Sequence, residues 1–275
     1  MNTTVQPIRH DLFGLTTTPF IQPPKQPFLD DARRECLATL ATFLRFRGFA
    51  AIAGRSGVGK TALLRYFTEA LHPPSHKIVY LPFSHLSEND LLKTLCSRLD
   101  TQPPFRKSAV IAAIHARIRE IQPINPVIVL DEMQNASDRA LDTIRLLAND
   151  QFDNGCNFSC ILVGATEFFE QLRFAIHEPL RQRITCFCQL RELSELATDE
   201  YLRHCLRQAG AEQPIFAPTA VQLIADASRG SIRLIAQLAA AALTIASAAE
   251  TTEVTLAHVR KAIQQTILPP REITP

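Results

Sequence analysis

The sequence predicts an α/β fold, in which a parallel sheet is flanked by helices and a small all-α domain follows at the C-terminal side. Three observations lead to this prediction. Over residues 1–190, short apolar runs alternate with amphipathic runs, a pattern typical of parallel sheets built from strand–helix–strand units. A glycine-rich loop joins the first of these strands to the helix after it. From residue 191 onward, helical runs follow one another with no strand between them.

The apolar runs and the helical spacing of apolar residues place the elements in order. Strands are expected at residues 49–53, 77–81, 126–132, 158–164 and 184–190. Helices are expected between them at about residues 31–46, 62–71, 87–99, 108–121, 137–149 and 167–174. Four further helices are expected at residues 195–209, 218–228, 232–249 and 256–267. Residues 1–28 contain five prolines, which leave little room for helix, so we expect an arm that packs on the body.

The loop after the first strand has the pattern G-x-x-x-x-G-K-[ST] of a phosphate-binding loop. It consists of Gly54, Arg55, Ser56, Gly57, Val58, Gly59, Lys60 and Thr61. The glycines let backbone N–H groups close around a phosphate, and the N-terminus of the following helix adds a positive dipole. We expect Lys60 to reach the β- and γ-phosphates and the Thr61 hydroxyl to bind Mg²⁺. The loop therefore predicts a site for a nucleoside triphosphate. On this basis we expect a nucleotide-binding domain at residues 1–190, a helical lid domain at 191–268 and a tail at 269–275.

Two adjacent acids, Asp131 and Glu132, end the apolar run that begins at residue 126. In phosphate-loop enzymes an acid at the end of a buried strand holds Mg²⁺, and Asp131 fits that role. Glu132 is placed to polarise an attacking water. The alternative is that both acids belong to a solvated turn. Together with the loop, the pair favours hydrolysis over binding alone.

Four other polar residues stand at the ends of expected elements. Thr166, after the strand that ends at residue 164, either senses the γ-phosphate or caps the next helix. Arg181 and Arg183 precede the last strand and either act across a subunit interface or lie in a polar surface turn. Arg233 begins a lid helix, where the helix dipole disfavours a cation, which suggests a role at the nucleotide.

The composition of the chain, its cysteines and its N-terminus indicate the class of protein and its setting. The chain has 275 residues, 46% of them hydrophobic and 20% charged, as in soluble globular proteins. Its N-terminus lacks the blocks of a signal peptide and its seven cysteines include no C-x-x-C, so we expect a reduced, cytoplasmic setting. Two cysteine pairs, 156/160 and 186/188, lie in or beside apolar runs, where cysteine usually packs as a small hydrophobe rather than binding metal. The longest apolar run, residues 234–249, is too short to span a bilayer.

Charge is unevenly distributed along the chain. Residues 1–130 carry 16 basic and 9 acidic side chains, whereas residues 131–275 carry 13 and 18. This asymmetry allows a basic face that a polyanion such as duplex DNA would need. Six basic residues cluster within one segment, namely Lys93, Arg98, Arg106, Lys107, Arg117 and Arg119. They either neutralise DNA phosphates without reading bases or form ordinary solvated helix faces.

The order of these motifs resembles that of AAA+ ATPases, and more narrowly their ExeA-like branch, near the transposition ATPases TniB, TnsC, MuB and IstB. The matching stretches cover nearly the whole chain. Besides the phosphate loop they are residues 13–15, 19–20, 47–49, 131–135, 145–149, 161–164, 180–184 and 230–233. Two positions depart from the family pattern: Met133 stands where a small residue is usual, and Ala165-Thr166 replaces Gln-Pro.

The resemblance implies an AAA+ ATPase that hydrolyses ATP with Mg²⁺ as a ring or helical filament of its own copies. Arg183, and less directly Arg181, is then the arginine that acts on the neighbouring subunit's nucleotide. Thr166 is then the first sensor of nucleotide state and Arg233 the second.

The same resemblance leaves three functions open. The one we expect is an oligomer on double-stranded DNA, without strong sequence specificity, that recruits or activates a DDE-type transposase, together with a target-selector protein and no membrane. The second is an ExeA-like ATPase of secretion or membrane-complex assembly. Such secretion proteins continue through a membrane span into a peptidoglycan-binding domain, for which this sequence shows no counterpart. The third is an AAA+ switch that does not act on nucleic acid.

Overall fold

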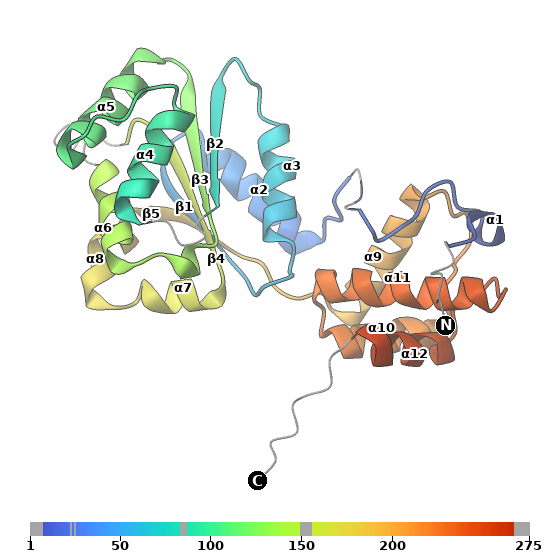
Figure 1. The fold of residues 1–275 in the computed structure, drawn as a ribbon. Coiled ribbons are helices and arrows are strands. Elements are labelled where there is room, and N and C mark those ends of the chain that lie inside the picture. The colour runs from blue at the N-terminus through green and yellow to red at the C-terminus, as the bar shows by residue number, and fades with distance from the viewer. Residues whose placement is uncertain (1–7, 23, 25, 83–86, 149–155, 267–275) are drawn as a thin grey trace, which may run out of the picture. The chain divides into compact units, whose positions relative to one another are not determined.

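A computed structural model describes residues 8–266, except residues 23, 25, 83–86 and 149–155 (Figure 1). The expected tail at 269–275 lies outside the described residues. The chain divides into two compact units, which are described separately. The sheet unit comprises Asp31–Arg55 and Leu63–Leu190, and the helical unit comprises Met1–Asp30, Ser56–Ala62 and Arg191–Pro275.

The sheet unit is built on a parallel sheet of five strands. The strands are β1 (Gly48–Ala53), β2 (His76–Pro82), β3 (Asn125–Asp131), β4 (Ser159–Gly164) and β5 (Ile184–Gln189). They lie in the order β2-β3-β4-β1-β5, and every neighbouring pair is parallel. The fold class and the five strands expected from the sequence are confirmed. All carboxyl ends of the strands therefore meet at one edge of the sheet, where ligands bind in open α/β folds.

The position of each strand in the sheet explains its residue pattern. The inner strands β3 and β4 are buried at every position, and β1 at all but Gly48, because helices cover both faces of a parallel sheet. At the edge, β5 alternates buried and exposed residues over most of its length. Its inward residues include Cys186 and Cys188, which are buried free thiols, as is Cys160 of β4. Burial raises the pKa of Cys160 well above its ordinary value. Among the described residues, no group of three or more His, Cys, Asp or Glu side chains gathers to hold a metal.

Helices flank the sheet on both faces (Figure 1). The helices of this part of the chain are α2 (Asp31–Phe43), α3 (Lys60–Glu69), α4 (Glu88–Arg98), α5 (Lys107–Glu120), α6 (Asp138–Leu147), α7 (Thr166–Gln171) and α8 (Glu178–Arg181), with short 3₁₀ turns η1 (Met133–Asn135) and η2 (Ala175–His177). One core joins α4, α5 and α6 to the sheet through residues such as Leu92, Ile114, Ile144 and Leu162. Ser87 and Ser137 cap α4 and α6, because their hydroxyl oxygens accept hydrogen bonds from the N–H groups of Asp90 and Ala140.

The helix expected to reach residue 46 is shorter in the structure. It ends at Phe43, and the next residues form single turns in which Arg45 and Phe46 donate to the carbonyls of Thr42 and Phe43. Arg47 then adopts a left-handed conformation, with φ of 58°, which continuous helix does not allow. This turn lets the chain enter β1 directly at Gly48.

The helical unit holds α9 (Glu195–Gln208), α10 (Pro218–Ser228), α11 (Ile232–Ala248) and α12 (Leu256–Thr266) around its own core. The alanine-rich helix α11 is the centre of this core, with Leu238, Ala239, Ala242 and Leu243 all fully buried. The small side chains of Ala239 and Ala242 leave room for the neighbouring helices beside α11. No helix of the described residues is long and apolar enough to cross a membrane.

The N-terminal arm, which contains the short helix α1 (His10–Phe13), packs within the helical unit. The Thr16 amide donates to the Ala209 carbonyl at 2.7 Å, and the Arg9 amide donates to the Ser247 hydroxyl at 2.8 Å. The Phe28 ring meets the Tyr201 ring edge to face. The sequence predicted that the arm belongs to the domain at residues 1–190, whereas the described residues between 8 and 30 group with the helices.

Candidate nucleotide-binding site

The loop at residues 54–61 leaves the carboxyl end of β1 and enters α3, whose first residue is Lys60. Gly57 and Gly59 have φ angles of 85° and 91°, a region that L-residues with a Cβ rarely adopt. These conformations turn the backbone into a tight loop ahead of the helix N-terminus, the arrangement that binds phosphate. Lys60 is buried, with 8% of its surface exposed, and Thr61 follows it in the first turn of α3.

The loop also contacts the start of α11 within the helical unit. The Arg233 amide donates to the Gly57 carbonyl at 3.2 Å, and its guanidinium donates to the Ser56 hydroxyl at 3.3 Å. A Cβ on Gly57 would come to 2.5 Å from the Ser231 hydroxyl and 3.3 Å from the Cβ of Arg233, so a larger residue there would displace the Ser231 side chain. Arg233 therefore contacts the phosphate loop, and its expected role as a second sensor of the nucleotide stays a prediction.

A tight turn before α11 positions the start of this helix for its contact with the phosphate loop. Gly230 has φ of 73°, and a Cβ there would overlap the backbone of Leu193. The Leu193 amide donates to the Gly230 carbonyl at 2.9 Å. The entry of α11 is therefore fixed against the segment that follows residue 190.

Asp131 ends β3 and is almost completely buried, with 1% of its surface exposed. Its Oδ1 accepts the backbone N–H of Glu132 at 2.8 Å, and its Oδ2 accepts the hydroxyl of Tyr80 at 3.0 Å. Burial and the nearby Asp131 charge raise the pKa of Tyr80 to about 12, so the phenol keeps its proton and remains a donor at neutral pH. Tyr80 therefore fixes the orientation of the Asp131 carboxylate.

Glu132 follows at the tip of the strand and is exposed. Its backbone is left-handed, with φ of 60° and ψ of 38°. Its carboxylate accepts a hydrogen bond from the side-chain amide of Gln134. The Gln134 carbonyl oxygen in turn accepts the backbone N–H of Ala165 at 2.9 Å, which links the acid pair to the end of β4.

The donors expected to hold Mg²⁺ suit that ion chemically. Mg²⁺ prefers oxygen ligands and usually keeps several waters, so one or two protein oxygens are enough beside phosphates. The Asp131 carboxylate and the Thr61 hydroxyl are such donors.

Thr166 stands at the same sheet edge as Asp131, because β4 is the direct neighbour of β3. It is exposed and is the first residue of α7, while Ala165 occupies the capping position. Thr166 therefore does not cap this helix, which removes that alternative. Its role as a sensor of nucleotide state stays a prediction.

The two candidate arginines lie in and just after α8. Arg181 is exposed and pairs with Glu178 one turn earlier. Arg183 is partly buried, and its guanidinium donates to the Pro179 carbonyl at 3.2 Å. Both stay candidates for action across a subunit interface.

The six basic residues considered for DNA contact do not form a uniform set. Lys107 pairs with Glu88 at 3.0 Å, and Arg117 bonds to the Leu99 carbonyl and to Glu120. These two side chains are engaged within the protein. The other four, Lys93, Arg98, Arg106 and Arg119, are exposed on and between α4 and α5.

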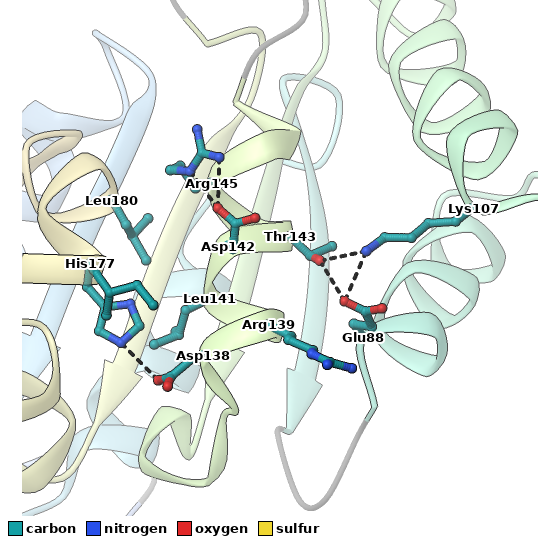
Figure 2. Close-up of a pocket in the computed structure, with 11 residues that line it drawn as sticks. Glu88, Lys107, Asp138, Arg139, Leu141, Asp142, Thr143, Arg145, His177 and Leu180 are labelled. Atoms are coloured by element: carbon teal, nitrogen blue, oxygen red, sulfur yellow. Dashed lines mark hydrogen bonds and ion pairs between the residues drawn. The ribbon is translucent and has the colours of Figure 1, made fainter.

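The Lys107–Glu88 pair lines a cavity of about 390 Å³ beside α6 (Figure 2). Lys107 also donates to the Thr143 hydroxyl at 3.2 Å, and its charge and hydrogen bond lower the pKa of Glu88. On the opposite wall, Nε2 of the buried His177 lies 2.9 Å from Asp138. These bonds join the N-terminal ends of α4, α5 and α6 to the segment after α7, so we assign them a structural role.

Sequence reasoning missed two residues that contact the acid pair, Tyr80 and Gln134. Tyr80 lies on β2, and its contact depends on the register that pairs Pro82 with Asp131, which sequence alone does not reveal. Gln134 follows Glu132 by two residues, and this short separation is the feature of the sequence that could have indicated the contact.

Comparison with known proteins finds similarity over the part of the chain that holds these residues. Residues 44–172 match the model of a family described as "AAA domain", and this segment includes the loop and the acid pair. General secretion pathway protein A of Aeromonas hydrophila is 34% identical over 232 residues. The aligned region is 81% of this chain and 42% of that protein, so the chain spans less than half of this relative.

Solved structures share the fold at low identity. Cdc6p from Pyrobaculum aerophilum gives a TM-score of 0.71 at 19% identity, over 96% of this chain and 72% of that one. The ORC2 protein of Aeropyrum pernix gives 0.69 at 18% identity, over 91% and 71%. Drosophila ORC bound to DNA gives 0.63 at 17% identity, over 98% and 70%. The chain therefore shares the fold of Cdc6p.

Proposed function

We propose that this chain binds ATP with Mg²⁺ and hydrolyses it. One edge of the sheet carries the proposal: β1 leads into the glycine-rich loop there, and β3 ends at the buried Asp131, which the exposed Glu132 follows. An anion cradle and an acid pair at one edge are what phosphoryl transfer to water requires. The AAA domain match over residues 44–172 supports the same activity.

Each residue has a separate task in this proposal. The loop amides and Lys60 bind the β- and γ-phosphates and neutralise their charge. Asp131 and Thr61 hold Mg²⁺, which supplies charge stabilisation at the phosphates when it is bound. Glu132 accepts a proton from the attacking water. Arg233, which contacts the loop at Gly57 and Ser56, senses the bound nucleotide.

We further propose that the site is completed by a second copy of the chain, through Arg183 and in part through Arg181. Neither arginine belongs to the loop or to the acid pair, and positive charge from a neighbouring subunit lowers the barrier to phosphoryl transfer. This predicts complementation. Glu132→Gln and Arg183→Ala subunits should each be inactive alone, and a mixture should recover turnover, because some interfaces then join an intact Glu132 to an intact Arg183.

The measurement is the ATPase rate of the two variants at constant total protein as their ratio is varied. Arg173→Ala provides a control, since Arg173 pairs with Glu170 on the surface much as Arg181 pairs with Glu178, and it should keep the parent rate. A mixture that never exceeds the mean of its two components would contradict a role for Arg183 in trans.

The partner is proposed from the relatives. The 34% identity to general secretion pathway protein A supports a role in the assembly of a secretion or membrane complex, in the region that the two proteins share. This observation favours the secretion class over the transposition class expected from the sequence.

A DNA-bound regulator of a transposase remains the second candidate. It is supported by the exposed basic residues of α4 and α5, among them Lys93, Arg98 and Arg106. Under this candidate the chain forms rings or filaments on duplex DNA through phosphate contacts, which do not depend on base sequence.

One experiment separates the candidates. Assemblies are imaged by electron microscopy with a non-hydrolysable ATP analogue, and ATPase rates are measured with ATP. Both are done with and without duplex DNA. The DNA candidate predicts DNA-dependent assemblies that are lost when Lys93, Arg98 and Arg106 are all replaced by alanine. They should survive the same change at three exposed residues of the helical unit, Arg207, Arg260 and Lys261. If DNA changes neither assembly nor turnover, the DNA candidate is lost, and a switch on proteins or a secretion partner remains.

A further inference from the structure

The turn that carries Glu132 is held by several hydrogen bonds. Glu132 has a left-handed backbone, a conformation that is unfavourable for a residue with a Cβ. Its N–H donates to the Asp131 carboxylate at 2.8 Å, and its carbonyl accepts the N–H of Asn135 at 3.0 Å. The backbone of Glu132 is therefore fixed on both sides, and the remaining freedom is in its side chain.

Gln134 holds that side chain. Its amide NH₂ donates to Oε2 of Glu132, and its carbonyl oxygen accepts the Ala165 N–H at 2.9 Å. Since a backbone N–H can only donate, the amide oxygen must face Ala165 and the NH₂ group must face Glu132. The amide of Gln134 therefore has one orientation that satisfies both partners, and this orientation leaves the other carboxylate oxygen of Glu132 to accept from water.

The Ala165 end of this connection belongs to a segment that is fastened again at its far end. Gln171, the last residue of α7, donates to the Asp138 carboxylate at 3.0 Å. His177 contacts the same carboxylate from η2 (Figure 2). The segment from 165 to 177 thus contacts the chain that follows Glu132 through Gln134 at one end and through Asp138 at the other. It leads directly into α8, which carries Arg181.

We infer that Gln134 is a positioning residue for Glu132: its amide orients the Glu132 carboxylate toward the attacking water. Because the same amide is bonded to Ala165, the orientation of that carboxylate depends on the positions of the end of β4 and of α7. The inference rests on the proposed hydrolysis of ATP. Through Gln134, the Glu132 carboxylate would respond to a movement of the segment that leads into α8 and Arg181, because a shift at Ala165 moves the amide that holds Glu132.

Two variants of Gln134 separate its two bonds. Gln134→Leu removes both. Gln134→Glu keeps an acceptor for the Ala165 N–H but replaces the donor toward Glu132 by a second negative charge. Asn135→Leu is the matched control, since Asn135 is the exposed neighbour in the same turn.

Both Gln134 variants should lower kcat about tenfold or more, because a hydrogen bond that orients a charged base is lost. The affinity for an ATP analogue should stay within about twofold of the parent value, since no phosphate contact changes. Asn135→Leu should leave kcat unchanged. Adding Gln134→Leu to Glu132→Gln should cause little further loss, because residues that act through one another are not additive. A parent-like kcat in both Gln134 variants, or full additivity with Glu132→Gln, would overturn the inference.

Hydrogen exchange supplies a readout that does not depend on catalysis. Exchange of the Ala165 amide should accelerate in Gln134→Leu and stay at the parent rate in Gln134→Glu and Asn135→Leu. Unchanged exchange in Gln134→Leu would overturn the proposed connection to β4. If Lys60→Ala and Glu132→Gln leave turnover intact, the proposed ATPase function itself fails. If they abolish it while both Gln134 variants remain active, only the role of Gln134 fails.

Discussion

Lys60→Ala is expected to abolish nucleotide binding. Lys60 is a buried cation at the first position of α3, within the loop that is proposed to surround the phosphates. Loss of its charge removes a charge-assisted contact to the β- and γ-phosphates in a site of reduced dielectric. We expect the dissociation constant for a fluorescent ATP analogue to rise by about 100-fold or more, equivalent to about 3 kcal/mol.

The measurement is a fluorescence titration with Mg²⁺ present, with Lys261→Ala as the control. Lys261 is an exposed lysine of α12, so its loss changes the net charge equally without touching the loop. Circular dichroism shows whether both variants keep the parent fold. Equal affinity in Lys60→Ala and the parent would contradict the assignment of the loop.

The sheet could be predicted from the sequence because the composition of its strands distinguishes them from the rest of the chain. The inner strands are continuous apolar runs, since both faces of a parallel sheet are covered, and the phosphate loop fixes which run is β1. Helix ends were less predictable. Phe43 ends α2 where apolar residues continue to Phe46, because the chain must turn into β1 and tertiary packing overrides local propensity.

The residues that orient the acid pair could not be predicted in the same way. Asp131 and Glu132 stand out as acids at the end of an apolar run, but Tyr80 lies 51 positions away along the chain. It reaches Asp131 only through the pairing of β2 with β3. Contacts of this kind depend on strand order and register, which a single sequence does not specify.

Counting basic residues in the sequence also could not predict which of them are exposed and available to DNA. Lys107 and Arg117 increased the apparent basic cluster, yet Lys107 pairs with Glu88 and Arg117 with Glu120 and the Leu99 carbonyl. A basic side chain that is engaged within the protein contributes less to a DNA-binding face than an exposed one. The arm shows the same dependence on tertiary contacts, since its packing with α9 through Phe28 and Thr16 has no local signal in the sequence.

Glu132→Gln is expected to stop hydrolysis while nucleotide binding is preserved. The substituted amide has nearly the same shape, and its oxygen can still accept the hydrogen bond from Gln134, so the turn after β3 should keep its structure. The amide cannot accept a proton from water at neutral pH, which removes the proposed general base. We expect kcat to fall by about 100-fold or more, with the affinity for an ATP analogue within about twofold of the parent. Single-turnover hydrolysis, measured alongside the binding titration, separates the two effects. Normal turnover in this variant would mean that another group activates the water, and the acid pair would then be reduced to a Mg²⁺ site at Asp131.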